Sequence, residues 1–132
     1  MPEICEVLEV APILRVSDPV LAAAWYSEKL GFSIDFFWPE PGGAQEPSYA
    51  IVRRGEATLH LSGVGSDSVT PALAYIFVSD VDLLAAELAE RGAGLGSGPR
   101  THTYGMREIE LTDLDGNHLT FGQGAVDVEV EA

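Results

Sequence analysis

Residues 13–31 read ILRVSDPVLAAAWYSEKLG, and residues 75–92 read YIFVSDVDLLAAELAERG. Each stretch begins with an apolar run typical of a buried strand and continues into Val-Ser-Asp. A Ser or Asp there can cap a helix, because its side chain accepts from the free N–H groups of the first turn. Apolar residues then recur at helical spacing, and each copy ends at a glycine, which favours the left-handed end of a helix. The chain therefore contains two copies of a strand–helix unit.

Each copy is followed by segments that predict strands. After the first copy, FSIDFFW is β-prone, EPGGAQEP interrupts it, and SYAIVRRGEATLHLSG has the pattern of a hairpin that turns at residues 53–55. After the second copy, the Gly/Pro/Ser-rich stretch GAGLGSGPRTHT precedes MREIELTDLDGNHLTFGQ, a hairpin pattern that turns at residues 113–117. The sequence therefore predicts the order βαβββ twice, in a module of residues 8–63 and a module of residues 71–123.

The ends of the modules are less regular. The stretch GVGSDSVTP, residues 63–71, has the composition of a linker between the modules. The tail GAVDVEVEA alternates apolar and acidic residues, which is typical of an edge strand or of a frayed end. A length of 132 residues suits a single domain that spans residues 1–132 and contains both modules.

Charge limits the classes of partner. The chain has 7 Lys and Arg against 21 Asp and Glu, a net charge of −14. Nucleic acids and anionic membranes need basic surfaces, so neither is expected as a partner, whereas a negative surface attracts cationic ligands. Cys5 is the only cysteine, so no internal disulfide can form, and no signal-peptide pattern precedes it. These features predict a soluble cytoplasmic protein.

The repeat, together with RVSD, AAAWYSEKLGF and YGMREIELTDLDGNHLTFGQ, resembles the vicinal oxygen chelate superfamily over residues 11–123. This superfamily includes glyoxalase I, extradiol dioxygenases and bleomycin-resistance proteins. The strings LGFSIDF, YAIVRRGEATLHLSG and YGMRE most resemble the bleomycin-resistance branch. The resemblance implies an α+β fold in which two βαβββ modules form curled mixed sheets around a cleft.

The resemblance also implies where a metal site would lie. Enzymes of the superfamily hold a divalent metal in the cleft, with one ligand near the first strand and one on the last strand of each module. In this sequence the four positions hold Ala11, His60, Leu73 and Thr120. One imidazole does not make a site, because a divalent ion needs several His or carboxylate ligands. We therefore expect no metal and no cofactor, which favours a non-catalytic protein.

The polar residues near the C-terminal hairpin have simpler interpretations. The short side chains of Asp113, Asp115 and Asn117 around Gly116 predict a turn that bonds its own backbone, rather than a metal site. His118 shares a strand face with Thr120, as an ordinary strand residue or as a residue of the cleft. His102 lies in the Gly/Pro/Ser stretch and is expected to be exposed. Arg107 and Glu108 must point to opposite faces of their strand, and which faces the cleft stays open.

Aromatic residues indicate a binding function, because flat rings stack on planar groups and attract cations. Similarity to bleomycin-resistance proteins implies ligand contacts at Phe36, Tyr49 and Tyr104, with Tyr104 in place of the usual tryptophan. For Phe36 and Phe77, packing in the core is the alternative. The residues expected to bind a ligand are Phe36, Trp38, Tyr49, His60, Ser62, Tyr75, Tyr104, Gly105, Met106 and Arg107.

These observations lead to one hypothesis with two alternatives. The hypothesis is a non-catalytic binding protein that resembles bleomycin-resistance proteins and confers antibiotic resistance by sequestering a cationic glycopeptide antibiotic in the clefts of a homodimer. The first alternative is a metal-dependent lyase or isomerase of the glyoxalase type, or a dioxygenase. The second alternative is a binding module for another metabolite or toxin.

Overall fold

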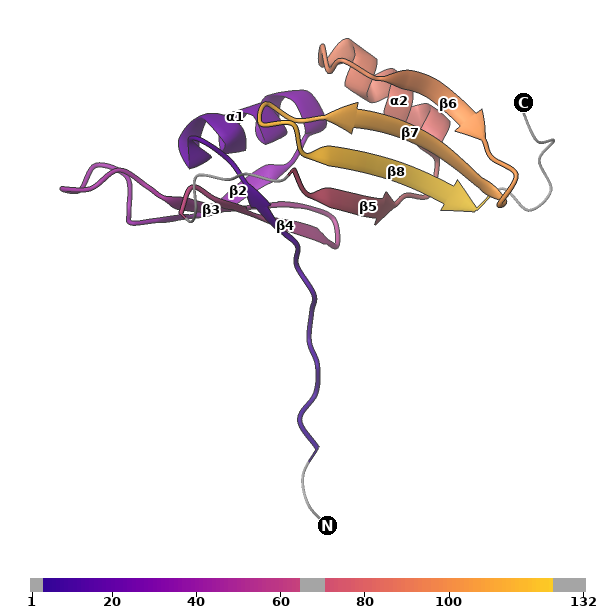
Figure 1. The fold of residues 1–132 in the computed structure, drawn as a ribbon. Helices are drawn as coiled ribbons and strands as arrows, with labels where there is room; N and C mark the ends of the chain where they lie inside the picture. The colour runs from indigo at the N-terminus through magenta and orange to yellow at the C-terminus, as the bar shows by residue number, and fades with distance from the viewer. Residues whose placement is uncertain (1–3, 65–70, 125–132) are drawn as a thin grey trace.

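A computed structural model of the chain describes residues 4–64 and 71–124. The predicted linker falls mainly outside these residues, and so does the predicted C-terminal edge strand or frayed end. Two four-stranded sheets and two helices make up the fold (Figure 1).

The first sheet has the strand order β1-β4-β3-β2, with β1 parallel to β4 and the other neighbours antiparallel. The second sheet repeats this pattern in the order β5-β8-β7-β6. The elements of the first module are β1 (Ile13–Arg15), α1 (Pro19–Leu30), β2 (Ser33–Trp38), β3 (Tyr49–Arg54) and β4 (Ala57–Ser62). Those of the second are β5 (Leu73–Phe77), α2 (Val81–Glu90), β6 (Ser97–Thr101), β7 (Met106–Thr112) and β8 (His118–Gly124). The predicted α+β class with two βαβββ modules is confirmed, and the mixed sheets do not close into a barrel.

Both helices begin at the aspartate of the Val-Ser-Asp motif. Oδ1 of Asp18 accepts from the N–H of Val20 at 2.9 Å, and Oδ1 of Asp80 accepts from the N–H of Leu83 at 3.0 Å. These bonds satisfy donors that a first helical turn leaves free. Helix α1 ends at Gly31, whose φ of 73° is the left-handed conformation that glycine adopts without a steric penalty. The aspartate, rather than the serine before it, is therefore the cap in both modules.

The core lies between each sheet and its helix. Helix α1 packs on β2, β3 and β4, and α2 packs on β6, β7 and β8. Buried side chains from both layers fill the space between them: Leu14, Tyr26, Leu30, Val52, Leu59 and Leu61 in the first module, and Leu84, Leu88, Ile109, Leu111, Leu119 and Phe121 in the second. Figure 1 shows α1 above the strands of the first sheet and α2 beside β6 and β7 of the second. The face of each sheet that points away from its helix is called its open face below.

The turn between β7 and β8 joins the second module to the first. The hydroxyl of Tyr26 in α1 donates to Oδ2 of Asp113 at 2.7 Å, and the N–H of Ser17 donates to Oδ1 of Asp115 at 2.9 Å. Asn117, which is fully buried, donates from Nδ2 to the carbonyl oxygen of Arg15 at 2.8 Å. The sequence predicted only a turn.

The local bonds of that turn are also present. Oδ1 of Asp113 accepts from the N–H groups of Asp115 and Asn117 at 2.8 and 2.9 Å, and Gly116 has a φ of 84°. The prediction that these residues bond their own backbone is confirmed. The same short side chains thus shape the turn and hold it against the first module.

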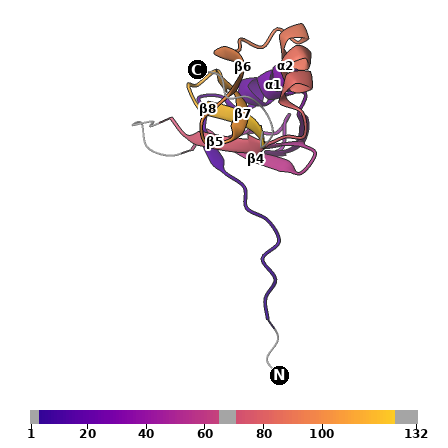
Figure 2. The same cartoon turned by 90° about the vertical axis from the view of Figure 1, so that its right-hand side faces the viewer.

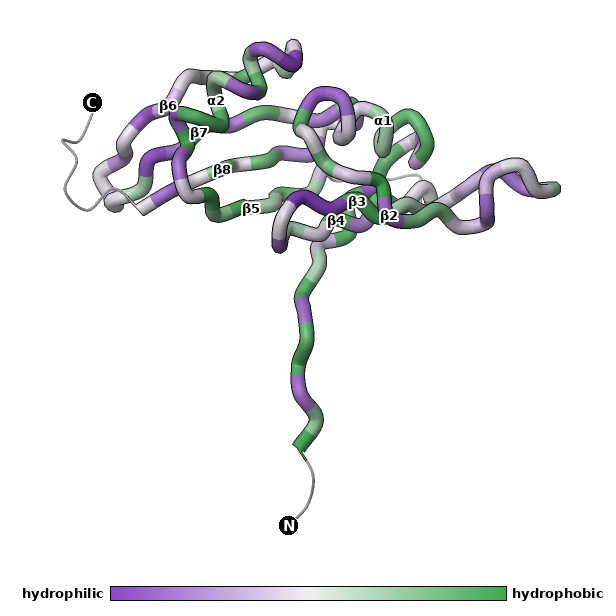
Figure 3. The backbone as a smooth tube through the Cα atoms, turned by 180° about the vertical axis from the view of Figure 1, so that it is seen from behind, coloured by the Kyte–Doolittle hydropathy of each residue, from purple (hydrophilic) through white to green (hydrophobic). Residues whose placement is uncertain are grey.

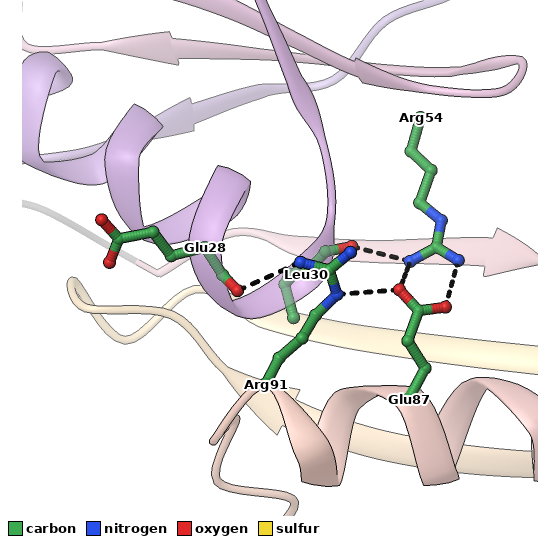
Figure 4. Close-up of polar contacts among 5 residues, drawn as sticks. All are labelled: Glu28, Leu30, Arg54, Glu87 and Arg91. Carbon is green, nitrogen blue, oxygen red and sulfur yellow. Dashed lines mark hydrogen bonds and ion pairs between the residues drawn. The ribbon is translucent and has the colours of Figure 1, made fainter.

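A second set of contacts runs in the opposite direction (Figure 4). Arg54 at the end of β3 donates through both terminal nitrogens to the carboxylate of Glu87 in α2, at 2.9 and 2.7 Å, and also to the carbonyl oxygen of Leu30. Arg91 donates to the same carboxylate at 2.8 Å and to the carbonyl oxygen of Glu28 at 3.4 Å. The bond from Arg54 is the main reason why the pKa of Glu87 is lowered. The hairpin of each module therefore contacts the helix of the other.

Residues 4–12 run away from the body of the domain as an extended segment (Figures 1 and 2). Ile4 is 90% and Leu8 is 87% exposed, and two glutamates, Glu6 and Glu9, interrupt the apolar residues of this segment (Figure 3). We call this segment the N-terminal arm. Among the described residues, no helix has the length and apolar character needed to cross a membrane.

Candidate ligand-binding faces

Five of the residues that the sequence predicted to bind a ligand lie on the open face of the first sheet. Side chains of directly opposed strand residues point to the same face of a sheet. Phe36 pairs with Ile51, which pairs with His60, and Trp38 pairs with Tyr49. Tyr49 also pairs with Ser62. Phe36, Trp38, Tyr49, His60 and Ser62 therefore share the open face.

The two large rings at this face are well exposed. Phe36 is 46% exposed and Trp38 is 61% exposed. For Phe36 the alternative of packing in the core is therefore wrong. Both rings offer flat apolar surface to a molecule outside the chain.

Tyr49 and His60 form a polar pair at the centre of this face. The Tyr49 hydroxyl lies 2.6 Å from Nδ1 of His60, and the rings meet edge to face with centroids 5.4 Å apart. When the tyrosine donates, the imidazole is the neutral tautomer whose Nε2 carries the proton. A pocket of about 340 Å³ adjoins the pair and is lined by Glu9, Ala11, Ile51, Arg53, Thr58 and His60. His60 therefore lines a hollow of the open face with one ring nitrogen already bonded.

The open face of the second sheet carries aromatic and acidic side chains together. Tyr75 pairs with Thr120, which pairs with Glu110. Phe77 pairs with Gly122, which pairs with Glu108. Tyr75 is 42% exposed and Phe77 is 77% exposed, with ring centroids 5.0 Å apart. For Phe77, too, packing in the core is wrong. Met106 shares this face by alternation with Glu108, and exposed His118 shares it by pairing with Leu73 and Thr112.

Glu108 is the centre of a cluster on this face. The residue is only 4% exposed, and each of its carboxylate oxygens accepts from a tyrosine hydroxyl, Oε2 from Tyr75 and Oε1 from Tyr104, both at 2.7 Å. Nε2 of His102 lies 3.4 Å from Oε1, and its ring stacks on Tyr104 with centroids 5.0 Å apart. The expectation that His102 is exposed is wrong, since its side chain is only 31% exposed and lies against this cluster.

The sequence does not determine to which face Glu108 points, and Glu108 was not among the residues expected to bind a ligand. A strand period of two places it on the face of Glu110, and Tyr104 precedes it by four residues across a turn. Those signals were in the sequence. The sequence does not show which face of the sheet α2 covers. Neither signal could therefore assign Glu108 to the cluster.

The carboxylate of Glu108 helps to raise the pKa of both tyrosines. The pKa of Tyr104 rises to about 12, first because its hydroxyl bonds to Glu108. The pKa of Tyr75 is also raised, by burial first and then by its bond to Glu108. Both hydroxyls thus keep their protons near neutral pH and donate them to the carboxylate. Tyr75 reaches Glu108 by crossing over Gly122, where a Cβ atom would collide with the tyrosine hydroxyl.

Arg107 lies on the helix side of the second sheet. It donates from Nε and Nη2 to the two carboxylate oxygens of Asp82 in α2, at 3.0 and 3.1 Å, and from Nη1 to Oγ1 of Thr101 at 3.0 Å. The bond from Arg107 is the main reason why the pKa of Asp82 is lowered. Gly105, with a φ of 88°, closes the turn before β7 by donating to the carbonyl oxygen of His102. Arg107 and Glu108 therefore point to opposite sides, and Glu108 is the one on the open face.

Strand register tests the four positions that hold the metal in enzymes of this fold. Ile13 of β1 pairs with His60, and Tyr75, which is its counterpart in the repeat, pairs with Thr120. His60 and Thr120 therefore occupy equivalent places. The first-strand positions are Ala11 and the exposed Leu73, neither of which carries a ligand atom in its side chain. Within residues 4–64 and 71–124, no three His, Cys, Asp or Glu side chains come together as a metal site would require.

A larger pocket of about 950 Å³ lies at the junction of the modules. The hairpin between β3 and β4 lines one part of it, and β5 and α2 line another. Buried core residues such as Leu59 and Leu84 contribute to its lining, as do Arg54 and Glu87, which form the ion pair between the modules. This pocket shares Thr58, Leu73, Tyr75 and Phe77 with the residues of the two open faces.

Comparison with known proteins agrees with this architecture. The family model described as "Glyoxalase superfamily protein" matches residues 3–128. The chain belongs to the glyoxalase superfamily. A comparison with proteins of curated function found no match.

Several solved structures are similar in fold to this member of the superfamily. It is similar to TioX from Micromonospora sp. ML1, with 19% identity, a TM-score of 0.75 and coverage of 89% of this chain and 99% of that one. A glyoxalase-related enzyme from Clostridium phytofermentans matches with 24% identity, a TM-score of 0.74 and coverage of 91% and 97%. At these identities both show the fold alone.

A third structure is the bleomycin-binding protein from bleomycin-producing Streptomyces verticillus, in complex with copper(II)-bleomycin. Its identity to this chain is 25%, its TM-score 0.71, and the match covers 92% of this chain and 99% of that one. Structures similar to this chain are thus described as an enzyme and as a binding protein.

Proposed function

We propose that this superfamily member binds a small cationic molecule without changing it chemically, and that its ligand is a glycopeptide antibiotic of the bleomycin type. One observation carries the proposal: the open face of the second sheet combines the exposed rings of Tyr75, Phe77 and Tyr104 with the carboxylates of Glu108 and Glu110. Rings and carboxylates side by side attract planar and cationic groups. The net charge of −14 and the similarity to a bleomycin-binding protein support the same class of ligand.

We also propose that the binding unit is a homodimer. Both helices lie on the same side of the chain (Figure 1), so the two open faces point away from that side rather than toward each other. A ligand that contacts both kinds of face needs the first sheet of one copy and the second sheet of another. Exposed apolar residues of the N-terminal arm, such as Ile4 and Leu8, offer further surface for a second copy to cover. Two equivalent clefts would result from such a symmetric pair.

Calorimetry with metal-free bleomycin and with copper(II)-bleomycin tests the proposal. We expect one drug molecule per chain, recovered unchanged by mass spectrometry, and an affinity that falls as the salt concentration rises. Light scattering of the same samples is expected to give the mass of a dimer. Absence of binding to both forms of the drug would refute the drug proposal, and a monomer that still binds at full stoichiometry would refute the dimer.

The same faces also fit another planar cationic metabolite or toxin. Native mass spectrometry of the freshly purified protein separates the two, because a stoichiometric ligand other than the drug would identify it directly. Elemental analysis addresses the enzyme alternative, since a stoichiometric metal with activity that depends on it would replace the binding proposal. A cytoplasmic location stays a prediction.

A further inference from the structure

We propose that Glu108 makes the open face of the second sheet selective for a cationic N–H donor, such as an amidinium, a guanidinium or an ammonium group, by orienting the hydroxyls of Tyr75 and Tyr104. The inference rests on the proposed binding of a small molecule and names the chemical group that the face recognises. Glu108 acts through the tyrosines and is an orienting residue.

The hydrogen-bond geometry fixes the direction in which the hydroxyls of Tyr75 and Tyr104 donate. A tyrosine hydroxyl has one proton to donate and lone pairs with which to accept. Tyr75 donates to Oε2 of Glu108 and Tyr104 donates to Oε1, both at 2.7 Å. With both protons directed at the carboxylate, each hydroxyl offers only lone pairs to a ligand. The pair is therefore an acceptor site, which suits a ligand that donates.

The negative charge of Glu108 is buried, so a ligand experiences it through the tyrosine hydroxyls that donate to the carboxylate. Glu108 is 4% exposed, whereas Tyr75 is 42% and Tyr104 is 64% exposed, so a ligand meets the tyrosines first. A hydroxyl that donates to a carboxylate becomes a better acceptor, because bonds in a chain polarise one another. A positively charged donor gains most from this polarisation.

The other charged groups on this face leave the balance negative. Exposed Glu110 lies on the same face. Arg100 of β6 lies opposite Glu108 in the strand register, so it shares this face as well. Two carboxylates against one guanidinium leave one negative charge when His102 and His118, which also lie on this face, are neutral. The rings add to this preference, since Phe77 is 77% exposed beside Tyr75 and a cation over an aromatic face is attracted by the ring quadrupole.

A pair of probes with one shape tests the selectivity. Benzamidinium carries a cationic donor group, and benzamide is its neutral isostere. We expect the full-length protein to bind benzamidinium about tenfold more tightly than benzamide, measured by NMR titration. Glu108→Gln is expected to remove most of this preference, because a glutamine amide can donate to a tyrosine oxygen and turn the hydroxyl outward as a donor. Glu90→Gln removes the same charge from an exposed site on α2 and is expected to keep the preference.

Two further readouts distinguish orientation from a structural role. Alkaline titration of the phenols is expected to move the pKa of Tyr104 from about 12 towards its ordinary value in Glu108→Gln. Tyr75→Phe and Tyr104→Phe each remove one acceptor while Glu108 stays in place, so each is expected to lower the preference in part. They also test the proposal if Glu108→Gln does not fold.

The outcomes separate this inference from the proposed function. Equal binding of the two probes, no detectable binding of benzamidinium, or an unchanged preference in Glu108→Gln would each overturn the role of Glu108, even if bleomycin binds. A preference for benzamidinium that depends on Glu108 supports the inference, even if bleomycin does not bind.

Discussion

The contact between Tyr26 and Asp113 provides a direct test of how the two modules are joined. Tyr26→Phe removes one hydroxyl from a fully buried ring, and with it the 2.7 Å bond from α1 to the turn between β7 and β8. The ring itself keeps its edge contacts with Trp25 and Phe32, at centroid distances of 5.1 and 5.8 Å. The variant therefore isolates the bond between the modules from the packing around it.

The expected loss follows from the partners of the carboxylate. A hydrogen bond to a charged group contributes roughly 1.5–3 kcal/mol. Asp113, which is 8% exposed, keeps its bonds from the N–H groups of Asp115 and Asn117 and from Nδ2 of Asn117, so it is not left without partners. We therefore expect the free energy of unfolding to fall by about 2 kcal/mol, in the lower half of that range.

Urea unfolding followed by tryptophan fluorescence measures this loss. Thr112→Val serves as the control, because it also removes one hydroxyl but from an exposed residue, and a surface substitution changes stability by about 0.5 kcal/mol or less. A double-mutant cycle with Asp113→Asn should give a coupling energy of about 1 kcal/mol or more. If Tyr26→Phe is as stable as the control, or if the two changes add independently, the bond does not join the modules as described.

Alkaline pH provides an independent check. Burial, followed by the charge of Asp113, raises the pKa of Tyr26 above its ordinary value of about 10. A group whose pKa is higher in the folded state contributes stability that is present below the unfolded pKa and is lost as the pH rises. Stability of the parent protein should therefore decline above a pH of about 10, and Tyr26→Phe should decline less steeply.

Three other changes test the local structure. Glu87→Gln should lower the free energy of unfolding by about 1 kcal/mol or less, because the paired side chains are about one-third exposed, and high salt should shrink the difference between variant and parent. Since the pKa of Glu87 is lowered, its contribution should be lost as the pH falls below about 4. Gly31→Ala should cost about 1–2 kcal/mol in urea unfolding, because φ is 73° and a Cβ would lie 2.9 Å from Arg91. Asp18→Ala removes the cap of α1 and should cost about 1 kcal/mol, with Asp18→Asn retaining most of the stability.

Local signals in the sequence were enough for much of the fold. The repeated Val-Ser-Asp motif, the helical spacing after it and the glycine at the end predicted α1 and α2, because caps and periodicity act within a few residues. The predicted order βαβββ required a strand between α2 and β7, but no residues were assigned to it, since β6 lies in a stretch rich in glycine and proline. Its extended conformation depends on pairing with β7, a contact that propensity does not contain.

The candidate site shows the same limit. Alternation along a strand predicts which residues share a face of the sheet. Only the position of the helix determines which of the two faces is covered. Arg107 and Glu108 could not be assigned for this reason, although α2 settles both through Asp82. His102 was misjudged because its stacking partner Tyr104 and its neighbour Glu108 come together only when the turn before β7 forms.

The exchange of contacts between hairpins and helices has a consequence for how the chain can be divided. The hydroxyl of Tyr26 donates to an acceptor in the second module, and Glu87 of the second module accepts from Arg54 of the first. A separate first half would bury a phenol without its acceptor, and a separate second half would expose the side chains of its turn to water. Two such fragments supplied together would each complete the other.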